Sequence, residues 1–313
     1  MRTSPPSPTR TTRKTRAAAR GAEIRRPGAF EVFRASPLPP GERGDPGLYG
    51  PGSTVWRVGR ERVLLAGGPA ALLLQIAHPM VAAAVADHGD FRQDPLARLR
   101  GTVDTVLAIS FGDRRQAEAA ARTVRTRHRA VSGTVDGKPY RATDPELGAW
   151  VHATLVHASL ESFALLVGPL TDAERDRYYQ EAKAFAALFG VTERHLPSDY
   201  PAFRAYFDER VAELAVGDDA RSLAPNILAP PLPLPASLLL PAQRLMTAGL
   251  LPASVRSAFG LGWMARDKAS FRAVSAGVRT GIKAVPPRLR YWPHYGRALE
   301  RLRLPGAVRK HGT

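Results

Sequence analysis

The chain has 313 residues, of which 44% are apolar and 23% charged, and this length suits one large domain or two small ones with a buried core. It contains no cysteine, which excludes disulfides, zinc–thiolate sites, iron–sulfur clusters and covalently attached c-type haem. A metal ion would have to be held by His, carboxylate, Tyr or Met. The formal net charge is +17.

The basic excess lies at the two ends of the chain. Residues 1–26 hold eight Lys and Arg against Glu23, and residues 241–313 hold fourteen against Asp267 and Glu300. Such ends are typical of nucleic-acid binding, but solvated tails of an arginine-rich chain are the favoured interpretation. Because no nucleic-acid motif accompanies them, we expect no specific nucleic-acid partner. Peripheral contact of the basic C-terminal region with an acidic surface stays a hypothesis.

The N-terminal residues 1–28 are rich in Pro, Ser, Thr and Arg, which predicts a disordered basic tail. No apolar stretch follows their arginines, so the tail lacks the features of a secretory signal and we expect a cytoplasmic location. Residues 29–55 are rich in Pro and Gly and predict an irregular lead-in.

One segment is apolar enough to require a membrane test. Val63–Ala86 contains no formal charge and is long enough to cross a bilayer. Residues 67–69, Gly-Gly-Pro, break it near its start, and Gln75, His78 and Pro79 interrupt the rest. A membrane span would not favour those residues, so we expect two buried helical pieces and no transmembrane segment.

Helical periodicity with start and stop signals dominates the remainder. In the first half of the chain we expect helices at 56–66, from Pro69 through 77 and past Pro79 to 86, from Pro95 to 111 with Asp94 as its cap, and from Asp113 to 131. A Thr143–Glu146 capping box predicts a helix to 167, and a Thr171–Glu174 capping box predicts one to 189, which Gly190 ends. Further helices are expected from Pro201 to 216 and near 236–248, 252–259 and 264–282, before a basic tail.

Two segments interrupt this helical pattern. Asp136-Gly137 predicts a small hairpin, and the proline-dense residues 224–235 are the candidate linker within the body. Since no alternating run is long enough for a larger sheet and no repeat is present, the fold is predicted to be all-α, with a single large helical domain.

Five of the eight histidines fall within one stretch of the predicted helical bundle. A lone histidine on an apolar helix is usually a structural core residue, but five in one stretch favour a site. They are His78, His88, His128, His152 and His157.

Their spacing excludes several kinds of metal site. No Glu-x-x-His of a di-iron bundle and no His-Glu-x-x-His zinc motif is present. His152 and His157 are five residues apart and point about 140° away from each other on a regular helix, so both cannot bind one ion. A mononuclear site assembled from different helices stays open. Motifs of serine hydrolases, phosphate loops and dinucleotide folds are also missing from the sequence.

Arg98 and Thr102 are four residues apart and share one face of a helix. An arginine on an apolar face requires an anion, which a cofactor carboxylate or Asp94 on the preceding turn would supply. His128 follows Arg125 and Arg127 toward a helix end, and neighbouring positive charge favours the neutral imidazole that binds metal. A single helical histidine holds haem iron in globins, but a helix-end histidine bonded to a carbonyl is the simpler alternative.

Several segments in a fixed order resemble the DUF2236 family, which includes MpaB-type oxygenases of meroterpenoid pathways and latex clearing proteins. The similarity covers roughly residues 60–300 and is specific through its combination of segments. The matching segments are QIAHPMVAAAVADHGDFRQDPLARLRGT (75–102), SFG (110–112), HRAVSG (128–133) and DPELGAWVHATLVHASL (144–160).

The resemblance implies an α-helical fold, non-covalent haem b and O2-dependent cleavage of an isoprenoid-type C=C bond. Its Arg-x-x-x-Thr pattern falls on Arg98 and Thr102, which become haem-site or catalytic residues, and its His-x-x-Val pattern falls on His128, which becomes the iron ligand. His78 and His152 belong to the pattern of the bacterial branch and are expected near the cavity or in buried hydrogen bonds.

Two differences from characterised family members bear on the expected substrate. Latex clearing proteins are exported and the fungal pathway oxygenase is membrane-anchored, whereas this sequence has neither feature, so a small apolar substrate is expected rather than solid rubber. The prediction is a haem-b-dependent oxygenase that uses O2. The alternative is a non-catalytic protein that binds haem or an apolar ligand. The expected divisions are a tail at 1–28, a lead-in at 29–55, the oxygenase-like helical domain at 56–304 and a basic tail at 305–313.

Overall fold

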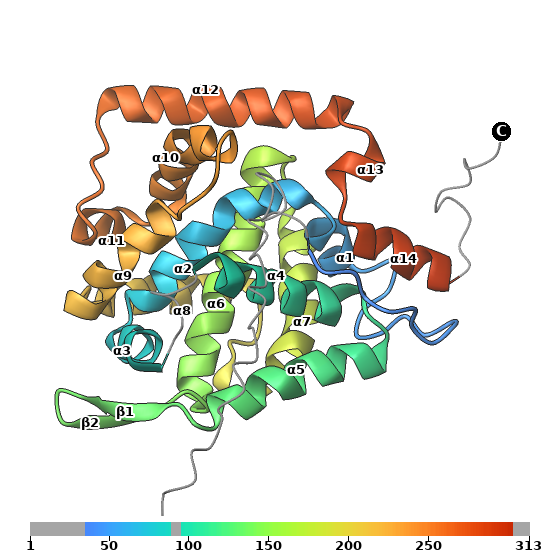
Figure 1. Ribbon diagram of the computed structural model, residues 1–313, viewed down its shortest axis with the longest axis horizontal. Helices are drawn as coiled ribbons and strands as arrows, with labels where there is room; N and C mark the ends of the chain where they lie inside the picture. Colours follow the sequence, from blue (N-terminus) through green and yellow to red (C-terminus); the bar gives the residue numbers. More distant parts are fainter. Residues whose placement is uncertain (1–34, 89–94, 303–313) are drawn as a thin grey trace, which may run out of the picture.

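The structure, a computed structural model, describes residues 35–88 and 95–302 (Figure 1). This part of the chain is mainly helical, with one two-stranded sheet, which confirms the all-α prediction. Its elements are α1 (Thr54–Gly59), η2 (Arg62–Gly67), α2 (Gly68–Ile76), α3 (Pro79–His88), α4 (Pro95–Phe111), α5 (Arg114–His128), β1 (Ser132–Val135), β2 (Lys138–Arg141), α6 (Pro145–Leu166), α7 (Asp172–Ala187), η4 (Glu193–His195), α8 (Tyr200–Glu213), α9 (Asp218–Leu228), η5 (Ala236–Leu239), α10 (Leu240–Leu250), α11 (Ala253–Ala258), α12 (Ala265–Gly281), η6 (Ile282–Ala284), α13 (Pro287–Arg290) and α14 (Pro293–Arg301).

Helix α6 runs through the middle of the domain, and α2, η2, α7 and α12 pack against it (Figure 1). Buried side chains lie on every face of α6, among them Trp150, Leu160 and Phe163. A helix surrounded in this way needs no polar face, which explains its near-continuous apolar sequence.

Helices α4 and α5 form an antiparallel pair joined at Gly112-Asp113. As predicted, Asp113 caps α5: its Oδ1 accepts from the Gln116 backbone N–H at 2.7 Å, and the Gln116 Oε1 accepts from the Asp113 N–H at 3.1 Å. Because the turn is tight, the first turns of α4 lie beside the last turns of α5. This arrangement positions the candidate site.

The apolar segment before α4 is two buried helical pieces, as expected. Helix α2 ends at Ile76 and α3 begins at Pro79, and Leu73 and Leu74 of α2 are fully buried. Within 35–88 and 95–302, no single helix has the length and apolarity of a membrane span. Only Arg62–Ile76 and Pro79–His88 taken together have both, and they meet at a bend of 103°.

The prediction of one helix over 56–66 is wrong. Helix α1 ends at Gly59 because the next residues pair with the C-terminal part of the chain: the Arg60 carbonyl accepts from the Trp292 N–H at 3.0 Å, and Glu61 forms a β-bridge with Tyr291. The chain then continues as the 3-10 helix η2.

The predicted capping box at Thr143 is also wrong. Asp144 is the cap of α6, and its carboxylate accepts from the Glu146 N–H at 2.9 Å. Pro145 then occupies the first helical turn, where its fixed φ and missing N–H cost nothing. The Thr171–Glu174 capping box of α7, in contrast, is confirmed.

Three C-terminal helices were not expected from the sequence. Helix α9 lies partly in the proline-dense segment and contains Pro225, yet it buries Leu223 and Ile227. Helices α13 and α14 lie between the last expected helix, at 264–282, and the basic tail expected at 305–313, and α14 packs against α4. Burial of one face stabilises α9 and α14 despite prolines and charges that disfavour them locally, whereas α13 has no buried residue.

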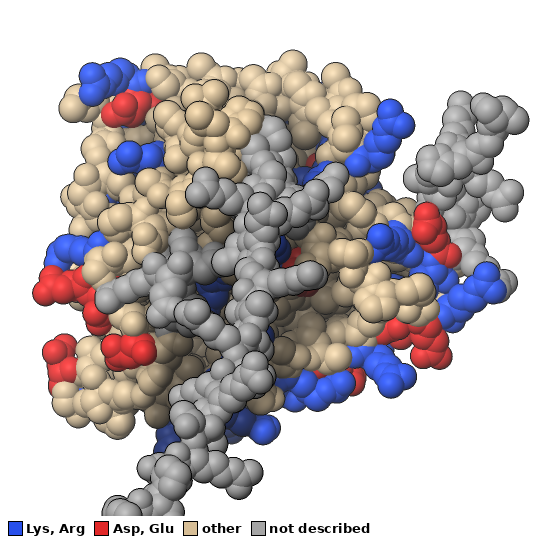
Figure 2. All heavy atoms as spheres, in the orientation of Figure 1, with Lys and Arg blue, Asp and Glu red and all other residues tan. Residues whose placement is uncertain are grey.

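The small predicted hairpin is confirmed. Strands β1 and β2 pair antiparallel, with Val135 opposite Lys138, and the turn residues Asp136 and Gly137 have φ of 50° and 77°. On the face in Figure 2, Lys and Arg side chains lie mainly around the edge, close to Asp and Glu.

We predict a destabilisation of about 2–4 kcal/mol for Gly47→Ala in the lead-in to α1. Gly47 is buried with φ of 81°, and an added Cβ would overlap the carbonyl oxygen of Gly112. Gly44→Ala is the matched control: Gly44 has φ of 83° but open space around the added Cβ, so about 1 kcal/mol is expected. Urea unfolding measures both, and equal losses would contradict the close packing at Gly47.

Candidate active site

Arg98 and His128 lie across the α4–α5 pair from each other. Arg98 is in the first turn of α4, and His128 is the last residue of α5. Burial, followed by the positive charge of Arg98, lowers the pKa of His128. We expected the positive charge that lowers this pKa to come from the neighbours Arg125, Arg127 and Arg129, but it comes from Arg98 on the facing helix. The half-buried imidazole is therefore neutral near pH 7, the form that binds a metal ion.

Thr102 follows Arg98 by one turn on the exposed side of α4. Its hydroxyl donates to the Arg98 backbone carbonyl at 3.0 Å, a bond within the helix. Because its proton is used there, Thr102 has only oxygen lone pairs to offer a ligand.

A cavity of about 90 Å³, here called the inner pocket, lies one turn further along α4. Val106 and Ser110 of α4 line it together with residues of the lead-in, α1, α6 and α7. Its lining residues are Tyr49, Val55, Val106, Ser110, His152, Leu155, Val156, Ser159, Tyr178, Ala182 and Phe185.

His152 is the unusual side chain of the inner pocket. It is 6% exposed, its ring stacks on Phe185 with centroids 6.4 Å apart, and neither ring nitrogen has a hydrogen-bond partner among the described residues. Burial lowers the pKa of His152 to about 4, so the ring is neutral with one N–H donor and one acceptor.

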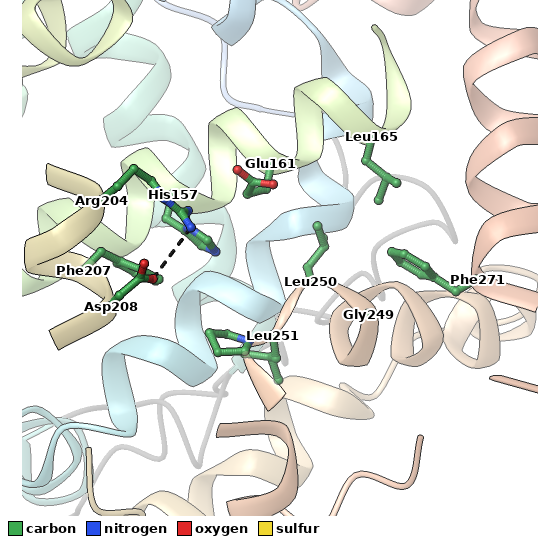
Figure 3. A pocket seen from close by; sticks show the side chains of 11 residues that line it. His157, Glu161, Leu165, Arg204, Phe207, Asp208, Gly249, Leu250, Leu251 and Phe271 are labelled. Atoms are coloured by element: carbon green, nitrogen blue, oxygen red, sulfur yellow. Dashed lines mark hydrogen bonds and ion pairs between the residues drawn. The ribbon is translucent and has the colours of Figure 1, made fainter. Parts of the chain in front are cut away.

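His157 lines a different cavity, of about 390 Å³, shown in Figure 3. Its ring stacks on Phe207 with centroids 4.1 Å apart, and Arg204 lies 3.4 Å from its Nδ1. Burial, with the charge of Arg204, lowers the pKa of His157 to about 3. The two histidines of α6 thus face separate cavities, as their spacing predicted.

The remaining two histidines of the stretch lie elsewhere. His78 sits at the break between α2 and α3, lines neither cavity, and has a buried Nδ1 without a partner among the described residues. Its pKa is lowered by burial and by Arg210 of α8. His88 is exposed, and its Nε2 lies 3.0 Å from the Ser132 carbonyl oxygen.

Within residues 35–88 and 95–302, no group of three or more His, Asp or Glu side chains is arranged to hold a metal ion. The arrangement therefore leaves a single imidazole ligand as the simplest metal chemistry for these residues. The roles of His128, Arg98, Thr102, His152 and His78 toward a cofactor stay predictions.

Sequence reasoning did not find the inner pocket. Ser110, Ser159 and Tyr178 come from three helices, and nothing in their local sequence signals that they meet. The available signals were the family segments: Ser110 belongs to the matched segment SFG, and His152 and Ser159 belong to the matched segment at 144–160.

Comparison with known proteins identifies the family of this chain. Residues 56–280 match the family model "ER-bound oxygenase mpaB/B'/Rubber oxygenase, catalytic domain". Similar proteins include the uncharacterized proteins Mb2261 of Mycobacterium bovis and Rv2237 of Mycobacterium tuberculosis, each 28% identical over 228 residues, covering 70% of this chain and 89% of the relative. No solved structure matches the chain. The chain belongs to the family of mpaB and rubber-oxygenase catalytic domains, and its expected membership is confirmed.

Proposed function

We propose that this protein is a haem-b-dependent oxygenase that acts with O2 on a small apolar, isoprenoid-type substrate. The family supplies the general activity, because its matched region is an oxygenase catalytic domain. The observation that carries the haem assignment is the neutral, half-buried His128 imidazole facing Arg98 across the α4–α5 pair.

The donor set fits haem b in its chemistry. His128 offers one neutral nitrogen ligand, and Arg98 offers a guanidinium that pairs with a carboxylate such as a propionate. The inner pocket, at about 90 Å³, is too small for a porphyrin and suits a small ligand or one end of a substrate. Haem is therefore assigned to the His128 end of α4 and α5, and the inner pocket to the substrate side.

Each residue then has a distinct task. Haem, when bound, supplies the activation of O2. His128 holds the iron, and the lowered pKa keeps its nitrogen free of a proton for that purpose. Arg98 orients an anionic group of the cofactor, and Thr102 accepts a hydrogen bond from a ligand through its remaining lone pairs. His78, whose pKa is lowered by burial and by Arg210, is assigned a supporting role.

The test is the absorption spectrum of the purified protein before and after haem is supplied. We expect a Soret band, followed by O2 consumption when an isoprenoid alkene is added. No band after reconstitution would overturn the haem assignment. A band without O2 uptake across a series of alkenes would favour the carrier function over the oxygenase.

A further inference from the structure

The inner pocket contains a polar side chain, that of His152, whose hydrogen-bonding capacity is not satisfied by the described residues. Both ring nitrogens of His152 are buried without a partner among the described residues. Buried polar groups are nearly always hydrogen-bonded in native proteins, and an exception points to a ligand or water. The cavity beside the ring has room for one.

Two other polar side chains of the inner pocket, those of Tyr49 and Tyr178, already have partners. The Tyr49 hydroxyl bonds to the Phe185 backbone, and the Tyr178 hydroxyl bonds to the Ser159 side chain. The neutral His152 ring can donate with one nitrogen and accept with the other. Because both of its ring nitrogens are buried without a partner among the described residues, His152 is available to form hydrogen bonds with a polar atom of a ligand.

The charges around the inner pocket restrict what can enter. None of its lining residues is Asp, Glu, Lys or Arg, so a formal charge on a ligand would be left unpaired in a buried site. Glu181 lies close enough to raise the pKa values of Tyr49 and Tyr178, which also disfavours an anion. The rest of the wall is apolar, with Val55 and Val106 among the lining residues. A neutral oxygen function on an apolar body fits these conditions.

The inner pocket adjoins the predicted reaction site. Thr102 and Val106 are one turn apart on α4, about 6 Å along the helix axis. The C-terminal end of α7 contacts both the inner pocket and helix α5. Phe185 of α7 stacks on His152, and the carbonyl of Leu188, just after α7, accepts a hydrogen bond from Arg125 of α5 at 3.0 Å. A ligand anchored at His152 therefore lies within a few helical turns of Arg98 and His128.

We propose that the inner pocket binds the neutral oxygen end, a hydroxyl or a carbonyl, of an otherwise apolar ligand, and that His152 recognises this oxygen by hydrogen bonding. The proposal rests on the proposed function only in taking this ligand to be the oxygenase substrate. His152 is then a specificity residue, and an oxygenated isoprenoid is preferred over the pure hydrocarbon.

The experiment compares geraniol, a C10 isoprenoid alcohol, with myrcene, a C10 isoprenoid hydrocarbon. Binding to the full-length protein is followed by isothermal titration and by the side-chain 15N signals of histidine. Wild type is expected to bind geraniol on the order of tenfold more tightly, as one added hydrogen bond provides. The His152 ring nitrogens should shift with geraniol and not with myrcene.

Variants separate recognition by His152 from general packing. His152→Phe should bring the geraniol-to-myrcene affinity ratio close to one, and His152→Gln, which keeps a donor and an acceptor, should retain part of the preference. His157→Phe is the matched control, because it makes the same change on the other face of α6, and it should leave the ratio unchanged. Circular dichroism confirms that each variant folds.

Equal affinities in wild type, with no shift at His152, would overturn the proposal and leave water as the occupant of the inner pocket. An unchanged ratio in His152→Phe would also overturn it. Binding is measured on the protein with and without added haem. The geraniol preference therefore tests this inference separately from the proposed function, which the Soret band and O2 uptake test.

Discussion

Replacing His128 with alanine is expected to abolish the Soret band of the haem-loaded protein and to reduce O2 uptake by more than about 100-fold, because the iron loses its protein ligand. Added imidazole should restore the band in part, since the substitution leaves room for a free ring. The measurements are the absorption spectrum and the oxygen electrode. The fold should persist, because His128 is half-buried at the end of α5.

His88→Ala is the matched control for this prediction. His88 also ends a helix, but its side chain is exposed and its Nε2 contacts the Ser132 carbonyl rather than a cavity. The control should keep both the band and the activity. A haem spectrum that is identical in wild type and His128→Ala would remove His128 as the ligand, and α5 would then have no role in holding iron.

Replacing Arg290 with alanine is expected to lower the free energy of unfolding by about 3–5 kcal/mol, because it leaves a buried carboxylate without its partner. Glu61 is 1% exposed, and its two oxygens accept from Arg290 Nε and Nη2 at 2.8 and 2.7 Å. Hydrogen bonding with Glu61 raises the pKa of Arg290. Chemical denaturation measures the loss.

Arg288→Ala provides the control on the same short helix α13. Its side chain is exposed, so a change within about 0.5 kcal/mol is expected. The double variant Glu61→Leu with Arg290→Leu should recover much of the stability, since apolar pairs often replace buried ion pairs at little cost. A loss below about 1 kcal/mol for Arg290→Ala would mean that Glu61 reaches water or another donor once Arg290 is gone.

Local sequence signals identified the elements that depend on neighbouring residues alone. The caps at Asp113 and Thr171 and the turn at Asp136-Gly137 are confirmed because their hydrogen bonds and φ angles involve residues within a few positions. Two of the errors arose where distant contacts decide: Glu61 ends α1 by pairing with residues some 230 positions away, and α9 forms around Pro225 because its other face is buried. The error at Thr143 is local, because the neighbouring Asp144 caps α6 instead.

The sequence by itself determined the helical class, the exclusion of thiolate sites and of the two helical metal motifs, and, through its family segments, the candidate residues Arg98, Thr102 and His128. Only the tertiary structure decided which of these meet. The tight α4–α5 turn puts Arg98 rather than the sequence neighbours of His128 beside the imidazole, and the packing of α4, α6 and α7 leaves His152 at a cavity without a partner among the residues that the structure describes. The reason is physical: electrostatic and hydrogen-bond environments depend on spatial distance, and residues far apart in sequence supply them.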